Sequence, residues 1–517
     1  MKKSVRIIAI LLAALTLTAV LCSCGDGKGP EATTKVTDEN GSPAEPVYGG
    51  EVTVGIAQDM DDSLDPHFMV AAGTREVLFN VFEGLVKPDS DGNLIPAVAS
   101  DYAISEDGTT FTFTLREGIK FHNGNAVTVG DVVFSITRAA GLETGAPLVD
   151  TLAVVESVEA TDDSTIVIKI AEPSIEALAY MTAAIIPEDV DLADNIIGTG
   201  PFKYVSRIPL ENFVIEKFDG YWGDAAYLDK VTYKIIPSGE TIVMSLKSGA
   251  VDMAVHLSST QTAELPEHKI IEGTMNLVQA LYLNHDVEPL GDLKVRQALC
   301  HALNRSEIME FVSDGLGSAL GSSMYPGFSK YFVPELVDMY EFDPEKGKAL
   351  LAEAGYPDGF DLEITVPSNY TPHINTAQVL VEQLRAIGVR ATINQIEWAS
   401  WLSDVYGERK YESTIIGFDA ATMTAAAVLD RWHSEHRRNM INFSSDEYDE
   451  TLESAHASID DKEQVALYKR CQEILAEQAA NVYIQDLCDL VAMRSDLDGY
   501  EFYPIYVVDM SKVYFIK

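Results

Sequence analysis

The sequence has 517 residues and is strongly acidic, with 80 aspartate and glutamate residues against 37 lysine and arginine residues and a formal net charge of −43. A chain this acidic repels nucleic acid and anionic lipid headgroups, which argues against both as partners. The globular part, about 470 residues, exceeds the size at which one hydrophobic core keeps growing, so more than one domain is expected.

The chain begins like a bacterial export signal. Three basic residues among the first six precede an apolar run, residues 7–21, that is too short for a membrane-spanning helix. The run ends in the letters LCSC, which resemble a bacterial lipobox. This pattern predicts a signal peptide over residues 1–23, cleaved before Cys24, with lipid attached to that cysteine. The alternative is an ordinary secretory signal in which both cysteines of the motif are incidental.

Residues 24–49 are polar and contain almost no apolar side chains. A segment of this composition cannot bury a core and predicts a disordered tether. Together, these features predict an exported protein that Cys24 anchors to the outer face of the cell membrane, or a periplasmic one.

Regular elements are predicted from about Gly50 onward. In the segment 96–140, the alternation of Phe111–Leu115 predicts a strand, Asn123-Gly124 predicts a turn, and Thr128 is placed to cap the helix that follows. Further along, residues 292–309 predict one continuous helix.

The segment from Gly198 to Ala254 predicts two short strands, a turn-rich loop with the letters FDGYWGD, a third strand and a helix. Residues 237–240 are expected to break the strand and cap the helix, which is predicted from Thr241 to Ser248 and ends at Gly249. A strand, a helix and a further apolar run in this order are typical of a βαβ unit in a mixed sheet.

These motifs resemble the extracellular solute-binding proteins of family 5, the peptide- and nickel-binding subunits of ABC transporters. The matching letters are GTGPFKYV, FDGYWGDAAYLDKVTYKII and SLKSGAVDMA, and an LDP and EGL pair precedes them. The segment 96–140 matches the family's longest signature. The resemblance covers roughly Gly50 to Lys517.

The resemblance implies an α/β fold of the periplasmic binding protein type II kind, with two lobes, a hinge and an inserted subdomain. Only two chain crossings would join the lobes, at hinge residues Asn284 and Leu490, which permits closure around a ligand. The implied divisions are 50–96, 198–283 and 491–517 for lobe I, 97–197 for the inserted subdomain, and 284–490 for lobe II.

The resemblance also implies a function. The protein would capture a small solute, an oligopeptide or a peptide-like molecule, between its lobes and deliver it to the permease subunits of an ABC importer, acting as a monomer. One alternative is a non-peptide ligand, such as a sugar-like solute or a metal chelate, bound for uptake or sensing. The other is an enzyme that uses the same cleft.

The sequence predicts no enzyme, no cofactor and no metal site. It has no GxSxG, no Walker loop and no GxGxxG after a strand. His433 and His436 could lie near one helical face, but a metal site needs three or four converging ligands, and three arginines flank this pair. Surface histidines are the simpler interpretation.

Three aromatic residues are candidate ligand contacts. Ligand clefts are commonly lined by aromatic side chains, and the family places ligand-facing residues near Trp398 and Trp401. Tyr325 stands in a loop of similar character. The alternative is that these side chains only anchor neighbouring elements.

One motif departs from the family pattern. Peptide-binding members carry GWxxDxxDP, whose first aspartate receives the ligand's α-ammonium group, but aligning residues 417–418 with Gly-Trp places Ala421 at that position. Asp419 is the acidic residue nearby and is predicted to anchor an amine-bearing ligand, with Arg431 as a counterpart for a carboxylate. The alternative is that Asp419 caps a helix beginning at Ala420.

Overall fold

The computed structural model describes residues 45–61, 63–69, 71–190 and 195–517. The predicted signal peptide, Cys24 and most of the predicted tether lie outside the described residues. Within these ranges, no helix combines the length and the apolar character needed to cross a membrane.

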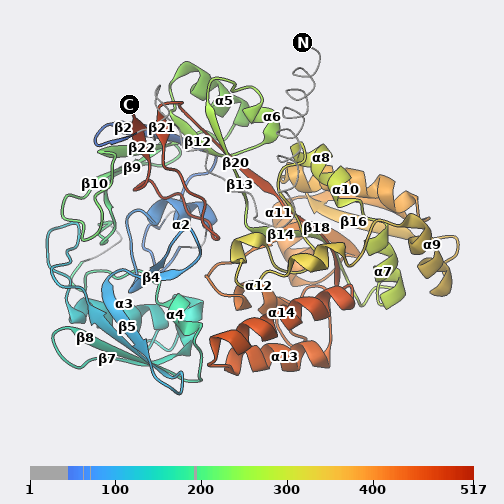
Figure 1. Ribbon diagram of the computed structural model, residues 1–517, viewed down its shortest axis with the longest axis horizontal. Helices are drawn as coiled ribbons and strands as arrows, with labels where there is room; N and C mark the ends of the chain where they lie inside the picture. Colours follow the sequence, from blue (N-terminus) through green and yellow to red (C-terminus); the bar gives the residue numbers. More distant parts are fainter. Residues whose placement is uncertain (1–44, 62, 70, 191–194) are drawn as a thin grey trace, which may run out of the picture. The chain divides into compact units, whose positions relative to one another are not determined.

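A seven-stranded mixed sheet forms around β2, which pairs in parallel with β11 on one side and β12 on the other. Figure 1 shows β20 (red) beside β12 and β13 (green), although more than 200 residues of chain lie between them. The strand order is β13 (Lys269–Thr274), β20 (Cys488–Met493), β12 (Met253–Leu257), β2 (Glu51–Ile56), β11 (Lys230–Ile235), β10 (Asn212–Lys217) and β9 (Phe202–Ile208).

The predicted βαβ unit is confirmed by β11, α5 (Gly239–Ser248) and β12. The Ser238 side chain accepts a hydrogen bond from the amide of Thr241, which satisfies one of the free N–H groups at the start of α5. Gly249 ends the helix with φ 71°, a left-handed conformation that glycine adopts without steric cost.

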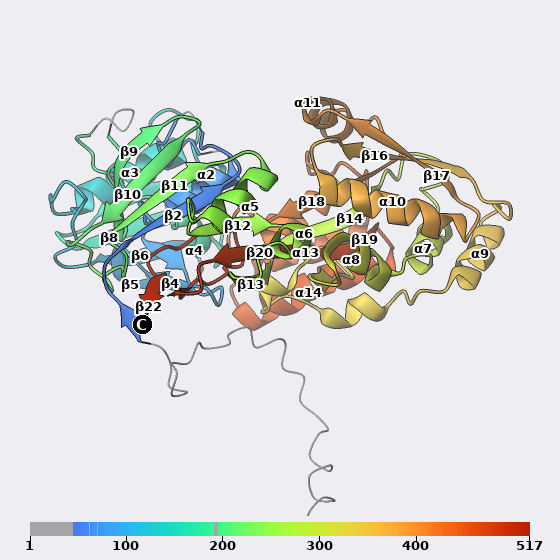
Figure 2. The ribbon, with the colours of Figure 1, turned by 90° about the horizontal axis from the view of Figure 1, so that it is seen from above.

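A second, six-stranded sheet is formed by strands that lie in the chain between β13 and β20 of the first sheet. Helix α10 (Thr371–Arg385) packs against β16 and β17 (Figure 2). The strand order is β15 (Ser318–Ala319), β19 (Asn481–Asp486), β14 (Leu277–Leu283), β18 (Ser413–Asp419), β16 (Asp361–Pro367) and β17 (Arg390–Ile396). Large hydrophobic clusters pack against this sheet, and a separate cluster packs against the seven-stranded sheet.

A four-stranded antiparallel sheet lies between residues 99 and 170, and its order is β5 (Ala99–Ile104), β6 (Thr110–Leu115), β8 (Thr165–Ile170) and β7 (Val155–Ala160). Helix α3 (Val129–Ala140) follows the predicted cap, since Thr128 and Asp131 form a reciprocal capping box. We refer to residues 97–190 as the insert.

The remaining elements are short or cover the sheets. The hairpin β3 (Val86–Pro88) and β4 (Leu94–Pro96) precedes the insert, and β1 (Pro46–Val47) pairs with β22 (Tyr514–Ile516), whose other neighbour is β21 (Leu497–Asp498). The other helices are α2 (Ala72–Leu78), α4 (Ala177–Tyr180), α6 (Ser259–Thr262), α7 (Leu293–His301), α8 (Arg305–Ser313), α9 (Pro344–Glu353), α11 (Trp398–Ser400), α12 (Ala426–Leu429), α13 (Asp446–Ala457) and α14 (Asp461–Glu477).

Two expectations differ from the structure. The continuous helix predicted over residues 292–309 is two helices, α7 and α8, because the Asn304 side chain caps α8 and Gln383 holds both backbone groups of Asn304. The predicted tether ends earlier than expected, because Pro46 and Val47 are paired with β22.

The chain crosses between the two large sheets at two places. One crossing is residues 275–276, between β13 and β14, and the other is Leu487, between β19 and β20. The amide of Met275 donates to the carbonyl of Leu487 at 2.8 Å, so the two crossing segments are hydrogen-bonded to each other.

The aromatic loop between β10 and β11 holds a buried carboxylate. Tyr221 Oη and Trp222 Nε1 each donate to Glu83 at 2.7 Å, and Lys87 Nζ lies 2.8 Å from the same carboxylate. The Arg116 guanidinium stacks 3.9 Å from the centre of a Trp222 ring. The loop therefore ties the seven-stranded sheet to the hairpin and the insert.

Replacing Glu83 with alanine should lower the melting temperature, since Tyr221, Trp222 and Lys87 lose their buried partner. Removing one member of a buried charge pair costs about 3–5 kcal/mol, which corresponds to a fall of about 3–5 °C in a chain of this size. Differential scanning calorimetry measures it, with Glu143→Gln, at an exposed position, as the control. Equal melting temperatures for the two variants would contradict the anchoring role.

Candidate functional site

Asp419 is the last residue of β18 and pairs with Leu277 of β14. Its carboxylate lies 4.0 Å from the guanidinium of Arg75, and the two side chains are 39% and 34% exposed. Arg75 belongs to α2, whose apolar face packs in the hydrophobic cluster of the seven-stranded sheet. This ion pair therefore joins elements of the two large sheets and remains open to solvent or a ligand.

The alternative role for Asp419, as the cap of a helix beginning at Ala420, is wrong. The next helix, α12, begins only at Ala426, and its N-cap residue is Ala425. The segment between contains no regular helix, because Asp419 is held in the extended pairing of β18 with β14.

Arg431 is a buried guanidinium for which no ion pair is found in the described part of the chain, although the Asp419 carboxylate attracts its charge. Its Nε and Nη1 atoms have no hydrogen-bond partner among the described residues, and its guanidinium stacks 3.7 Å from the centre of the Phe418 ring. Burial lowers the pKa of Arg431, and the nearby hydroxyls of Tyr406 and Tyr282 oppose this effect. A buried cation with unused donors is suited to receive a carboxylate or another anion.

The predicted aromatic residues lie in the hydrophobic cluster of the six-stranded sheet. Trp401 is 1% exposed, donates to Thr414 Oγ1 and stacks on the half-buried Trp398 with ring centres 5.2 Å apart. Tyr325 is fully buried and donates to the carbonyl of Pro504. Of the three residues, Trp398 has the most side-chain surface left for a ligand.

The predicted hinge residues do not coincide with the chain crossings. Asn284 follows β14, which pairs along its whole length with β18, and its side-chain amide donates to the carbonyls of Arg409 and Tyr411. Leu490 lies inside β20, paired with Leu257 and Glu272 of the seven-stranded sheet. Leu490 is therefore held within a sheet and Asn284 is fixed directly after one, and the division at 284 assigns β14 to the wrong sheet.

A charged cluster beside the crossings was not predicted. His256 interacts with Glu76 at 2.6 Å and with Asp489 at 3.0 Å. Burial alone would lower the pKa of His256, but the two carboxylates outweigh it and raise the pKa well above its usual value. His256 also has φ 57°, an uncommon conformation for a residue other than glycine. No sequence pattern joins these three residues, which come from α2, β12 and β20.

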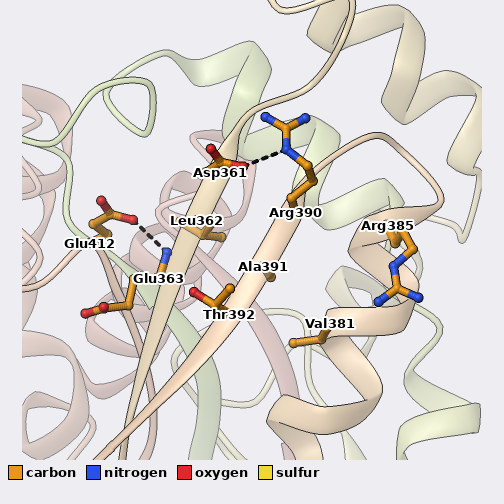
Figure 3. Close-up of a pocket in the computed structure, with 9 residues that line it drawn as sticks. All are labelled: Asp361, Leu362, Glu363, Val381, Arg385, Arg390, Ala391, Thr392 and Glu412. Carbon is orange, nitrogen blue, oxygen red and sulfur yellow. Dashed lines mark hydrogen bonds and ion pairs between the residues drawn. The ribbon is translucent and has the colours of Figure 1, made fainter.

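A cavity of about 410 Å³ lies elsewhere, along the outer strands β16 and β17. In Figure 3, the Arg390 side chain reaches Asp361, and Glu412 accepts from the backbone amide of Glu363. Both arginines in this cavity are exposed, and none of its residues was a predicted site residue.

The described residues contain no group of three or more histidine, cysteine, aspartate or glutamate side chains that could hold a metal ion. The His433 ring lies 4.0 Å from the carboxylate of Asp449 and 3.5 Å from that of Glu453. The free cysteines found are Cys300, Cys471 and Cys488, and burial raises the pKa of each thiol.

Comparison with known proteins identifies the family. A model of the bacterial extracellular solute-binding proteins, family 5, matches residues 93–439, about two thirds of the chain. The chain belongs to this family. The resemblance found in the sequence is thereby confirmed.

Relatives of this family 5 protein bind different ligands. The dipeptide-binding protein of Escherichia coli (strain K12) is 27% identical over 464 residues, covering 80% of this chain and 84% of that protein. A periplasmic binding protein of Helicobacter pylori, solved with the peptide STSA, has a TM-score of 0.74 at 27% identity, covering 91% and 99% of the two chains. The binding protein AgaA of A. tumefaciens R10, solved with agropinic acid, has a TM-score of 0.73 at 26% identity, covering 90% and 99%. The α/β fold of the type II kind is thereby confirmed.

Replacing Arg431 with methionine should leave the melting temperature unchanged or raise it, because an unpaired buried charge is removed and the contact with Phe418 is kept. Exchanging buried charges for apolar groups is often neutral or stabilising by about 1–4 kcal/mol. The control is Arg296→Met, since Arg296 is buried and donates to four backbone carbonyls. Equal losses in both variants would show that Arg431 has a structural role.

Proposed function

We propose that this family 5 protein is the substrate-binding component of an ABC importer, which captures a solute between two lobes outside the cytoplasm and delivers it to a permease. Lobe I would be built on the seven-stranded sheet, together with the insert, and lobe II on the six-stranded sheet. The observation that carries the proposal is the Arg75–Asp419 ion pair beside the two chain crossings. Charged groups from both sheets meet there, and a ligand touching both would favour the closed arrangement.

The proposed hinge is the pair of crossing segments, residues 275–276 and Leu487. Asp486 reinforces them by accepting a hydrogen bond from the amide of Leu277 at 3.1 Å. Burial raises the pKa of Asp486 to about 8, so this carboxyl is protonated at neutral pH. Rotation about two short connections is the usual basis of domain closure.

The proposed ligand is an oligopeptide or a peptide-like molecule, as in the dipeptide-binding relative. Asp419 would receive an amine by displacing Arg75, and Arg431 would pair with a carboxylate. Trp398 would contribute an aromatic wall, supported by the buried Trp401 stacked on it, while Tyr325 is buried against Phe328 and Pro504. A ligand that carries a carboxylate without a free amine is the second candidate, because Ala421 replaces the usual amine-binding aspartate and an agropinic acid-binding protein is among the structural neighbours.

Calorimetric titration of a di- to pentapeptide panel tests the peptide assignment. Asp419→Asn should weaken binding of peptides with a free amine at least about tenfold, because a charged partner is lost at a partly exposed site. N-acetylated versions of the same peptides are the matched control, since they should bind both proteins equally. Absence of peptide binding, or equal affinity of wild type and variant, would refute the amine contact at Asp419.

The protein would act as a monomer held at the outer face of the cell membrane by lipid on Cys24. Two acyl chains on one residue hold a protein far more firmly than one chain does. Metabolic labelling with a fatty-acid probe should mark the protein, and Cys24→Ala should abolish the label. Cys22→Ala is the control and should keep it. Persistent labelling of the Cys24 variant would contradict the anchor.

A further inference from the structure

The insert and the helices over the six-stranded sheet are joined by one buried hydrogen bond. The Tyr468 hydroxyl of α14 donates to Oε2 of Glu176, the residue immediately before α4. Glu176 is 7% exposed and Tyr468 is fully buried. The two residues are 292 positions apart in the sequence and come from the two proposed lobes. Separation of the lobes at this point would break the bond and expose both groups to water.

The Glu176 carboxyl is poorly suited to carry a charge in this position. Its second oxygen, Oε1, is buried and has no hydrogen-bond partner among the described residues. An ionised carboxylate oxygen without a partner is costly to bury, whereas the protonated form avoids most of that cost. Water in a separated junction would satisfy the same oxygen.

The charges facing Glu176 come from several elements. From lobe II, His456 of α13 attracts its negative charge and Asp430 repels it. His456 and Asp430 pair with each other at 2.8 Å. The hydroxyls of Tyr468 in α14, Tyr180 in α4 and Tyr331 in the loop before α9 also interact with the Glu176 charge. The charged residues Lys330 and Asp461 line the cavity beside Glu176.

Burial raises the pKa of the Glu176 carboxyl to about 7. The hydrogen bond from Tyr468, the charge of His456 and the backbone amide of Ala426 only partly oppose this, and Asp430 adds to the rise. For His456, burial lowers the pKa, but the hydrogen bond and charge of Asp430 outweigh it and raise the pKa. Because His456 is itself titratable and its charge acts on Glu176, an experiment must separate the two groups.

We propose that Glu176 and Tyr468 form a proton-dependent latch, in which a protonated Glu176 holds the insert against lobe II and its ionisation releases the two lobes. A cavity of about 520 Å³ lies at the same junction and is lined by Glu176, Tyr331 and Gln464, among others. This space gives water access to the latch as the lobes begin to separate.

The direction of the pH effect follows from the two states. In the separated state, Glu176 is hydrated and ionises near its ordinary pKa of 4.5, whereas in the latched state it ionises near 7. The latched state is therefore favoured most below pH 4.5, weakens as the pH rises towards 7, and changes little above that. The ratio of latched to separated molecules changes at most tenfold for each pH unit. Between pH 4.5 and 7 this ratio therefore falls by no more than about 300-fold.

Distance measurement by double electron–electron resonance tests the latch in the full-length chain without ligand. Spin labels are placed at Glu159→Cys in β7 and Lys462→Cys in α14, both exposed, and Cys22, Cys24 and Cys488 are replaced by serine in every sample. Between pH 4.5 and 8, the short-distance population should decrease with rising pH. Glu176→Gln should keep that population high at every pH, since glutamine accepts the Tyr468 hydrogen bond without ionising.

Two further variants separate the neighbouring groups. His456→Gln should retain a fall with rising pH, and Tyr468→Phe should lower the short-distance population at every pH without removing its pH dependence. Calorimetry verifies that each variant is folded. A distance distribution independent of pH in the wild type, or an unchanged pH dependence in Glu176→Gln, would overturn the proposal.

The latch rests on the proposed movement of the lobes but not on the identity of the ligand. Closure by ligand with no response to pH would refute the latch alone. The opposite outcome has two parts: Glu176→Gln removes the response to pH, and no solute closes the lobes. That outcome would refute the proposed function and leave the latch in place.

Discussion

The arrangement of this protein depends on how few covalent connections join its two large sheets. The chain passes from one sheet to the other at residues 275–276 and returns at Leu487, and these two segments are hydrogen-bonded to each other. Each sheet has its own hydrophobic core, so a change in their relative orientation need not disturb either core. The relative orientation of the two sheets is therefore set by non-covalent contacts, and these can respond to a ligand or to solution conditions.

Two polar contacts join elements of the two lobes away from the crossings. Arg75 meets Asp419 in a partly exposed ion pair, and Tyr468 meets Glu176 in a buried hydrogen bond. The first contact contributes little net free energy because water competes for both charges. The second depends on whether the carboxyl carries a proton. Weak contacts of this kind are suited to the proposed movement, in which the closed and open arrangements of the two sheets are close in free energy.

The Arg75–Asp419 pair and Arg431 also shape the proposed specificity. In peptide-binding members of the family, an aspartate at the position of Ala421 receives the ligand amine, and here that charge is absent. Asp419 already has an arginine opposite it, while Arg431 has two nitrogen atoms without a partner. The positive charge of Arg431 is therefore the part of the site that lacks a hydrogen-bonded partner, which favours a ligand with a carboxylate. This preference agrees with a peptide C-terminus and equally with an acidic non-peptide solute.

The sequence alone determined the family, the α/β class and many local elements. Short-range signals were sufficient for these features. Helix α5 begins after Ser238, whose side chain accepts a backbone hydrogen bond, and ends at Gly249 in a left-handed conformation, and Thr128 caps α3. Prediction from the sequence failed where the end of a helix or the pairing of a strand depended on residues distant in the chain. The break between α7 and α8 relies on Gln383, and β14 belongs to the six-stranded sheet because it pairs with β18 and β19.

The tertiary structure alone decided which charges meet. Nothing in the local sequence around Glu176 or His256 distinguishes these residues from the other acidic and polar side chains of the chain, and the EGL letters that contain Glu83 do not indicate its partners. Their roles arise because elements distant in sequence bring Trp222, Tyr468 and Asp489 against them. The sequence did identify Asp419 and Arg431 as unusual residues, since they stand where a family motif departs from its pattern. It could not assign Arg75 to Asp419, because an ion pair between two sheets is set by their packing and not by spacing along the chain.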